Sequence, residues 1–264
     1  NVIGGTFAIW KTNGHVIDKM VINPMAAMKC AFGENPKRVY SDNKIKTRMQ
    51  TAAYLRETLM KTKEYMAKKA LAGDDISKQP AYDMKLEAMI PVLEKKIPLK
   101  THAHRADDIL TALRIAREFD VLMTLDHCTE GHLIVDEVKA SGFPAFVGPS
   151  LTDKSKFELK NLTFATAGIL NKAGVKIALI TDAPVIPQEY LPLCAGLACK
   201  KGLAEMEALK AITINPAEIL GIADRVGSLT AGKDADIVVS DGNIFNTLTN
   251  VNYTFINGEM VYQF

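Results

Sequence analysis

Two histidines and an aspartate stand at the C-terminal ends of apolar runs in the middle of the chain. These runs are 97–104 with His102, 121–127 with His127, and 176–182 with Asp182. In a β/α barrel the side chains at the C-terminal ends of the strands converge on one mouth, so the pattern predicts that the three residues meet there. Neutral imidazoles can hold a metal cation and a carboxylate can move a proton, so the pattern indicates a metal-dependent hydrolase.

A lone histidine at a strand end is usually structural. Here His127 follows His102 by about 25 residues, close to the length of one strand–helix–strand unit. This coincidence favours a metal or substrate site. His104 shares the run of His102, and period-two alternation places both on one face unless the strand has already ended. We assign His104 to the substrate.

Asp182 closes an apolar strand, where an unpaired carboxylate is costly to bury. It could cap a following helix, but Pro184 and Pro187 indicate a loop there, which favours a catalytic role. Two readings remain open for Glu34, which follows another apolar strand at 27–32. It could ligate or bridge a metal, or it could pair with Lys37 or Arg38.

Other polar residues carry weaker signals. Lys29 is an alternative ligand if it is carbamylated. Arg105 and the lysines 154, 156 and 160 could meet an anionic substrate, although runs of lysine usually form a solvated face. His15 and His132 have no partner pattern and are expected at the surface.

The elements that position these residues alternate between strand and helix. Helices are expected over 47–72 and 80–94, followed by strand–helix units from 97 to 182. This order predicts an α/β fold with a parallel sheet or barrel in a domain spanning 1–223. The segment 224–264 predicts a small β subdomain of two or three antiparallel strands, with a hairpin turn at Asn257 and Gly258.

The composition excludes several classes of protein. The 264 residues include 32 basic and 30 acidic side chains, for a net charge of +2, without a basic patch for nucleic acid or a membrane surface. No apolar run approaches the roughly 18–20 residues that a bilayer span needs. The four cysteines lack C-x-x-C spacing, which indicates reduced thiols in a cytoplasmic protein.

Together these residues resemble the amidohydrolase superfamily, in its imidazolonepropionase-related branch. The resemblance spans essentially the whole chain. It is carried by the segments 1–5 (NVIGG), 31–38 (AFGENPKR), 102–108 (HAHRADD), 126–127 (DH), 181–185 (TDAPV), 208–216 (ALKAITINP) and 227–236 (GSLTAGKDAD).

The resemblance implies a metal-dependent (β/α)₈ TIM-type barrel, with a β-sandwich portion that includes 224–264. It implies that His102 and His127 bind a divalent metal, with zinc expected first and manganese or iron as alternatives. Asp182 would bind the metal and shuttle protons, and Glu34 would occupy the position where some members of the family supply a bridging carboxylate or a modified lysine. The reaction would be hydrolysis of C–N bonds in amides, cyclic amides or amidines by a metal-activated water.

The chain departs from the family pattern in two places. No His-x-His pair precedes His102, so roughly the first 100 residues of such a barrel enzyme are expected to be missing. Such a piece should hold at most one metal, weakly, and be inactive alone. Its open sheet edges favour a homo-oligomer. Ala183 follows Asp182 where relatives often carry histidine, which predicts altered substrate contacts.

Three functions compete on this sequence. The leading one is a C–N hydrolase acting on a small-molecule substrate. The second is a prolidase-like dipeptidase of the same superfamily. The third is a non-catalytic, metal-free binding protein that kept the barrel mouth.

Overall fold

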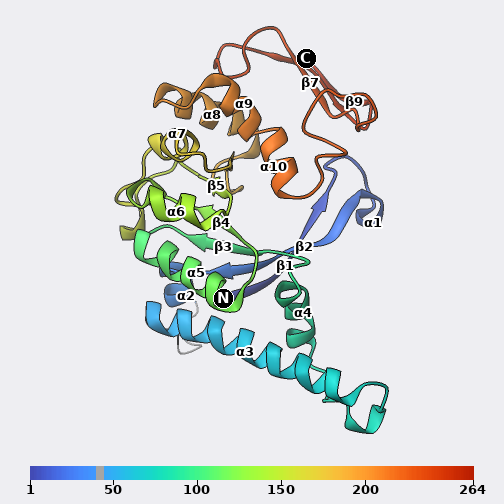
Figure 1. Ribbon diagram of the computed structural model, residues 1–264. Coiled ribbons are helices and arrows are strands. Elements are labelled where there is room, and N and C mark those ends of the chain that lie inside the picture. The colour runs from blue at the N-terminus through green and yellow to red at the C-terminus, as the bar shows by residue number, and fades with distance from the viewer. Residues whose placement is uncertain (40–44) are drawn as a thin grey trace.

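The fold is built on a six-stranded sheet in which five consecutive strands run parallel. The computed structural model describes residues 1–39 and 45–264 (Figure 1). The sheet runs in the order β1-β2-β3-β4-β5-β6. Its strands are β1 (Ile3–Trp10), β2 (Val21–Ala31), β3 (Leu99–Ala103), β4 (Met123–His127), β5 (Ala145–Val147) and β6 (Ile177–Leu179). β1 is antiparallel to β2, and β2 to β6 are parallel.

Helices connect the parallel strands and continue the chain beyond β6. They are α1 (Ile17–Met20), α2 (Glu34–Val39), α3 (Arg48–Ala72), α4 (Met84–Leu93), α5 (Ala106–Phe119), α6 (Val135–Ser141), α7 (Ala165–Lys172), α8 (Leu191–Lys200), α9 (Glu205–Ala211) and α10 (Ile214–Ile219). Each step from β3 to β6 crosses over through one helix, α5, α6 or α7. This alternation is a partial TIM-type barrel, which confirms the predicted α/β fold class. In the part of the chain that is described, β1 and β6 are the two edges of the sheet.

The helices begin where local signals place them. Thr47 forms a capping box with Gln50 at the start of α3, which confirms the helix expected over 47–72. α4 begins four residues later than the sequence suggested, because Asp83 accepts hydrogen bonds from the backbone N–H groups of Lys85 and Leu86 and caps the helix there.

The core lies between the sheet and the helices packed on it. Leu99, Leu125 and Ile177 are completely buried on the strands, and Ile109 and Leu113 of α5 belong to the same cluster. Burying a leucine or isoleucine contributes about 1.5–3 kcal/mol, so this layer fixes the strands whose ends carry the candidate site.

The last segment forms the expected antiparallel sheet. Its strands are β7 (Ile237–Ser240), β8 (Val251–Ile256) and β9 (Glu259–Gln263), in that order. Asn257 and Gly258 both have left-handed φ, 53° and 78°, as the predicted hairpin turn requires. The domain boundary at residue 224 stays a prediction.

A buried lysine joins the two sheets. The Lys11 ammonium, at the end of β1, lies 3.0 Å from Asp234 and 2.5 Å from Asp236, just before β7. The Lys11 side chain is 8% exposed, so this double ion pair is protected from solvent more than an ordinary surface pair is. It anchors the β1–β2 hairpin to the C-terminal segment.

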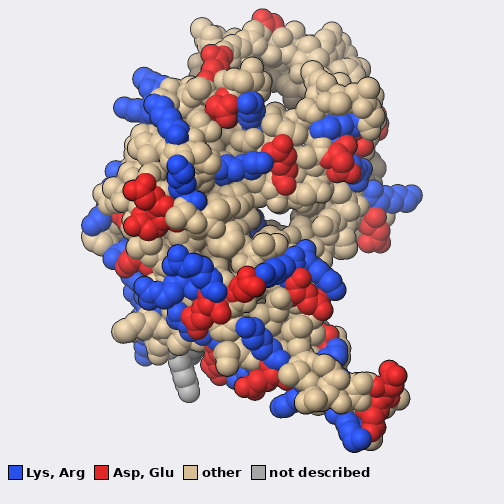
Figure 2. Space-filling model, in the orientation of Figure 1, with Lys and Arg blue, Asp and Glu red and all other residues tan. Residues whose placement is uncertain are grey.

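The molecular surface mixes both signs of charge. Figure 2 shows lysine and arginine interspersed with aspartate and glutamate over the visible face. Among the described residues, no helix has the length and apolar character needed to cross a bilayer.

Substitution of Gly148, which follows β5, tests how tightly the ends of the strands are packed. A Cβ atom there would lie 2.2 Å from the Ile180 carbonyl oxygen, and its φ is +136°. We expect Gly148→Ala to lower the free energy of unfolding by about 3 kcal/mol, because both the backbone conformation and the contact become strained.

The matched control is Gly142→Ala. Gly142 has φ +70° but open space around its Cβ position, so a loss of about 1 kcal/mol is expected there. Urea unfolding of both variants measures the difference. Equal losses would show that the packing at Gly148 is not tight.

Candidate active site

Three histidine side chains meet at the C-terminal ends of β3 and β4. The ring centroids of His102 and His127 lie 4.4 Å apart, and those of His104 lie 4.7 Å from His102 and 4.6 Å from His127. One potential ligand atom of each ring lies within 4.8 Å of the others. The three residues are 2% to 6% exposed. The predicted convergence of His102 and His127 is therefore confirmed, and His104 joins them.

His127 reaches this cluster through an unusual backbone conformation. The register pairs His102 with Asp126 and Ala103 with His127, so alternation alone would place Asp126 on the face of His102. His127 and Cys128 instead have left-handed φ values of 69° and 46°. The strand turns sharply at its last residue, which brings the His127 ring to the mouth.

Each ring is held by a hydrogen bond to a different segment. His127 Nδ1 donates to the Gly148 carbonyl oxygen (2.7 Å), so its Nε2 carries a lone pair. His104 Nδ1 lies 2.7 Å from Thr129 Oγ1. Asn35 Nδ2 lies 3.2 Å from His102 Nε2, and Lys156 Nζ donates to Asn35 Oδ1 at 2.8 Å, which orients the amide so that its nitrogen faces the histidine.

The three imidazoles are neutral. Burial lowers the pKa of His104 to about 2 and that of His127 to about 3, and it holds the pKa of His102 well below its usual value. The ammonium groups of Lys29 and Lys156 act in the same direction on all three. Neutral imidazole is the form that binds metal, so this donor set fits a divalent cation.

A charged layer shares the inward face of His102. Asp126 lies 2.8 Å from the Lys100 ammonium and 3.9 Å from that of Lys29. Lys100 Nζ also stands 3.9 Å from the centroid of the Phe146 ring. Sequence reasoning missed Lys100 and Asp126, although their period-two spacing from His102 and Thr124 was a usable signal. It singled out Lys29 for a different role, as a modified ligand.

Asp182 follows β6 at the same mouth. Its φ is left-handed, 52°, and its side chain is exposed. Partial desolvation raises the pKa of Asp182. The nearby Asp126 carboxylate raises it further, and the Lys29 ammonium lowers it. The charges of Lys29 and Asp126 therefore affect the Asp182 carboxylate. Asp182 is nevertheless not part of the close histidine cluster.

Glu34 is bonded to Glu158, a contact that the sequence did not predict. Its carboxylate accepts a hydrogen bond from the Glu158 backbone N–H (3.2 Å), and its own N–H donates to Glu158 Oε2 (2.8 Å). The structure thus joins Glu34 to the loop after β5 instead of to Lys37 or Arg38. The cluster of close ligand atoms does not include it.

Arg105 pairs with Asp107, two residues further along the chain. Its guanidinium makes two 2.9 Å hydrogen bonds to the Asp107 carboxylate and lies 5.8 Å from the Phe157 ring centroid. The three lysines of the same region differ from one another: Lys156 reaches Asn35, whereas Lys154 bonds the Lys160 backbone and Lys160 stands over the Phe157 ring.

Glu158 is the functional candidate that the sequence did not reveal. It is fully buried, and burial raises its pKa while Lys156 opposes the shift. It lies in a single 3-10 turn, Phe157–Leu159, which is too short to leave a periodic pattern in the sequence. Arg48, which pairs with Asp108 at 2.9 Å, approaches Glu158 to 3.9 Å.

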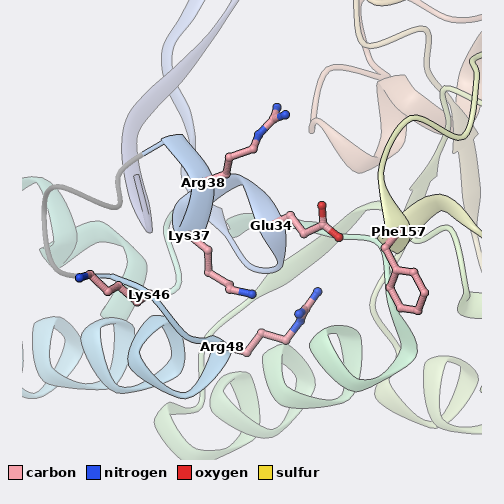
Figure 3. Close-up of a pocket in the computed structure, with 6 residues that line it drawn as sticks. All are labelled: Glu34, Lys37, Arg38, Lys46, Arg48 and Phe157. Carbon is pink, nitrogen blue, oxygen red and sulfur yellow. The ribbon is translucent and has the colours of Figure 1, made fainter.

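A basic pocket adjoins this region. It encloses about 490 Å³, and Figure 3 shows the Glu34 carboxylate, the Arg48 guanidinium and the Phe157 ring facing the same space. Its lining residues are Glu34, Lys37, Arg38, Lys46, Arg48 and Phe157.

The family of the chain follows from its sequence profile. The Amidohydrolase family profile matches residues 15–261, so the chain belongs to the amidohydrolase family. An amidohydrolase from Thermotoga maritima MSB8 with a known crystal structure is 44% identical, with a TM-score of 0.95 over 100% of this chain and 69% of that chain.

Curated relatives support the imidazolonepropionase-related branch. An imidazolonepropionase of Streptococcus pyogenes serotype M2 (strain MGAS10270) is 32% identical over 166 residues, which are 61% of this chain and 37% of that protein. A Xaa-Pro dipeptidase structure with bound methionine shares the fold, at 21% identity and a TM-score of 0.52 over 70% of this chain and 50% of that chain. The chain spans 23% and 37% of the length of the first two curated relatives.

The neutral histidines predict how stability depends on pH. Below the ordinary histidine pKa of about 6.5 the unfolded chain binds protons that the folded cluster refuses, so the free energy of unfolding falls as pH drops from 7 toward 4. Replacing His104 with Gln removes one side chain that binds a proton in the unfolded chain but not in the folded chain. The slope of unfolding free energy against pH should therefore become shallower by up to about 1.4 kcal/mol per pH unit.

Urea unfolding between pH 4 and 7.5 measures this slope. The carboxylates with raised pKa are common to both proteins and cancel in the difference. His15→Gln, on an exposed loop residue outside the cluster, is measured in parallel as the substitution control. A His104 variant with the wild-type slope would contradict neutral burial of this ring.

Proposed function

We propose that this chain carries part of the active site of a metal-dependent hydrolase that cleaves C–N bonds in amides, cyclic amides or amidines. The observation that supports it most is the cluster of three buried, neutral imidazoles at the C-terminal ends of adjacent barrel strands. Membership of the amidohydrolase family supports the same reaction class.

The proposal gives each residue a distinct part. His102 and His127 would hold the metal, zinc first among the candidates, and the bound metal would supply an activated water. Asp182, with its raised pKa and its place at the mouth, would carry the proton to the leaving nitrogen. Glu34 would supply a further carboxylate to the metal. His104 and Arg105 would contact a small-molecule substrate.

Metal uptake is the first test. Chelator-treated protein should take up about one equivalent of zinc, because three imidazoles already lie within coordinating reach. His127→Ala should reduce the affinity at least tenfold, since ligand count sets metal affinity. Elemental analysis and calorimetric titration measure both quantities.

His15→Ala is the control and should bind zinc like the wild type. Absence of uptake in the wild-type chain would overturn the proposal for this chain. Manganese and ferrous iron, titrated in parallel, identify the preferred metal.

The reaction class needs a substrate panel. We expect the metal-loaded protein, in its longest available form, to hydrolyse cyclic amides faster than X–Pro dipeptides, and Asp182→Asn to lower kcat at least a hundredfold because the proton carrier is lost. Product formation measured by chromatography checks both expectations. Faster turnover of X–Pro dipeptides would assign a dipeptidase instead.

A further inference from the structure

Within the described part of the chain, Glu158 presents a buried carboxylate oxygen, Oε1, that accepts no hydrogen bond and has the Lys156 ammonium as an ion-pair neighbour. Its side chain is 0% exposed, and among the described residues its Oε1 atom makes no hydrogen bond. His104 Nε2 lies 4.0 Å away and Lys156 Nζ 3.8 Å away, both beyond hydrogen-bond distance. Leaving such a group unsatisfied costs several kcal/mol, so a ligand donor at this position would be strongly favoured.

The surrounding backbone is shaped around this carboxylate. Glu158 Oε2 accepts from the Glu34 backbone N–H at 2.8 Å. Gly33 has φ +79°, and a Cβ there would lie 2.5 Å from Oε2. Only glycine allows this approach, so one oxygen is fixed by the β2–α2 junction and the other is left toward the histidines.

Lys156 supplies the complementary donor. Its ammonium has three N–H groups, one of which donates to Asn35 Oδ1 at 2.8 Å. Asn35 in turn contacts His102. The ammonium and Glu158 Oε1 thus form a donor and an acceptor 3.8 Å apart beside the histidine cluster.

We propose that Glu158 and Lys156 form an amide-recognition pair. Glu158 Oε1 accepts the N–H of the substrate amide, and Lys156 Nζ donates to the carbonyl oxygen of the same amide. In a cyclic amide the N–H and C=O point to the same side, which suits a donor and an acceptor on one wall. The peptide bond that precedes a proline has no N–H. An X–Pro dipeptide would therefore leave Glu158 Oε1 without a hydrogen bond. This inference rests on the proposed function and narrows its substrate to cyclic amides.

The test compares two probes with the same ring, one with hydrogen and the other with methyl on its ring nitrogens; the Glu158→Gln variant below separates the hydrogen bond from the added size. Hydantoin carries two ring N–H groups, and 1,3-dimethylhydantoin carries none. Calorimetric titration of the wild-type chain should show hydantoin binding about tenfold tighter or more, the size expected of a hydrogen bond to a charged acceptor. Equal binding of the two probes, or binding of neither, would overturn the proposal.

Two variants assign the roles within the pair. In Glu158→Gln the amide oxygen must face the Glu34 N–H, so its NH₂ occupies the Oε1 position and opposes the N–H of the probe. The preference for hydantoin should fall below about threefold. Lys156→Met should weaken both probes by a similar factor, because both keep their carbonyl oxygens.

Lys160→Met is the matched control, because its ammonium stands over the Phe157 ring and should not affect either probe. Circular dichroism of each variant verifies folding. A retained preference in Glu158→Gln would overturn the assignment.

Zinc uptake, measured on the same samples, separates the two proposals. Uptake without probe discrimination rejects the amide pair alone. Discrimination without uptake rejects only the metal-dependent function.

Discussion

Three imidazoles packed within reach of one another and away from solvent cannot carry charge, and this constraint organises the barrel mouth. Each ring needs a hydrogen-bond partner that tolerates the neutral form. The partners come from three separate segments: the Gly148 carbonyl after β5, Thr129 after β4 and Asn35 at the start of α2. Satisfying the cluster therefore fixes the loops around it.

The charges around the cluster reinforce neutrality. Lys29, Lys100 and Lys156 disfavour protonation of His127. Asp126 balances the first two of these lysines on the inward face of the sheet, and Glu158 lies beside the third. The site is thus prepared for a cation that binds through lone pairs, whereas a proton on the same rings is excluded by burial.

The sequence predicted the framework well because the framework follows local rules. The strand ends at His102 and His127, the long helix beginning near Thr47 and the hairpin at Asn257 all follow from spacing or turn chemistry. His127 was placed correctly by barrel geometry, although strict alternation would have pointed it away. The left-handed turn that corrects this is a tertiary effect, invisible in single-residue propensities.

The finer parts of the site could not be predicted because they depend on contacts between segments that are distant in the sequence. Glu34 and Glu158 are 124 positions apart and bind reciprocally through backbone and carboxylate. Asn35 reaches across to His102. The lysine-rich segment between β5 and α7 lacks periodicity, so residue types alone did not distinguish a surface lysine from Lys156, which orients the amide of Asn35.

The α3–α4 hairpin is a part of the fold where the chain can accept insertions. The end of α3, the turn after Gly73 and the start of α4 project away from the barrel (Figure 1). Leu71 and Ile76 there are both 88% exposed. Lengthening a surface connection costs little, since the entropy of closing a loop rises slowly with its length. This arm is therefore where insertions can accumulate, or a fluorescent reporter be attached, without disturbing the histidine cluster.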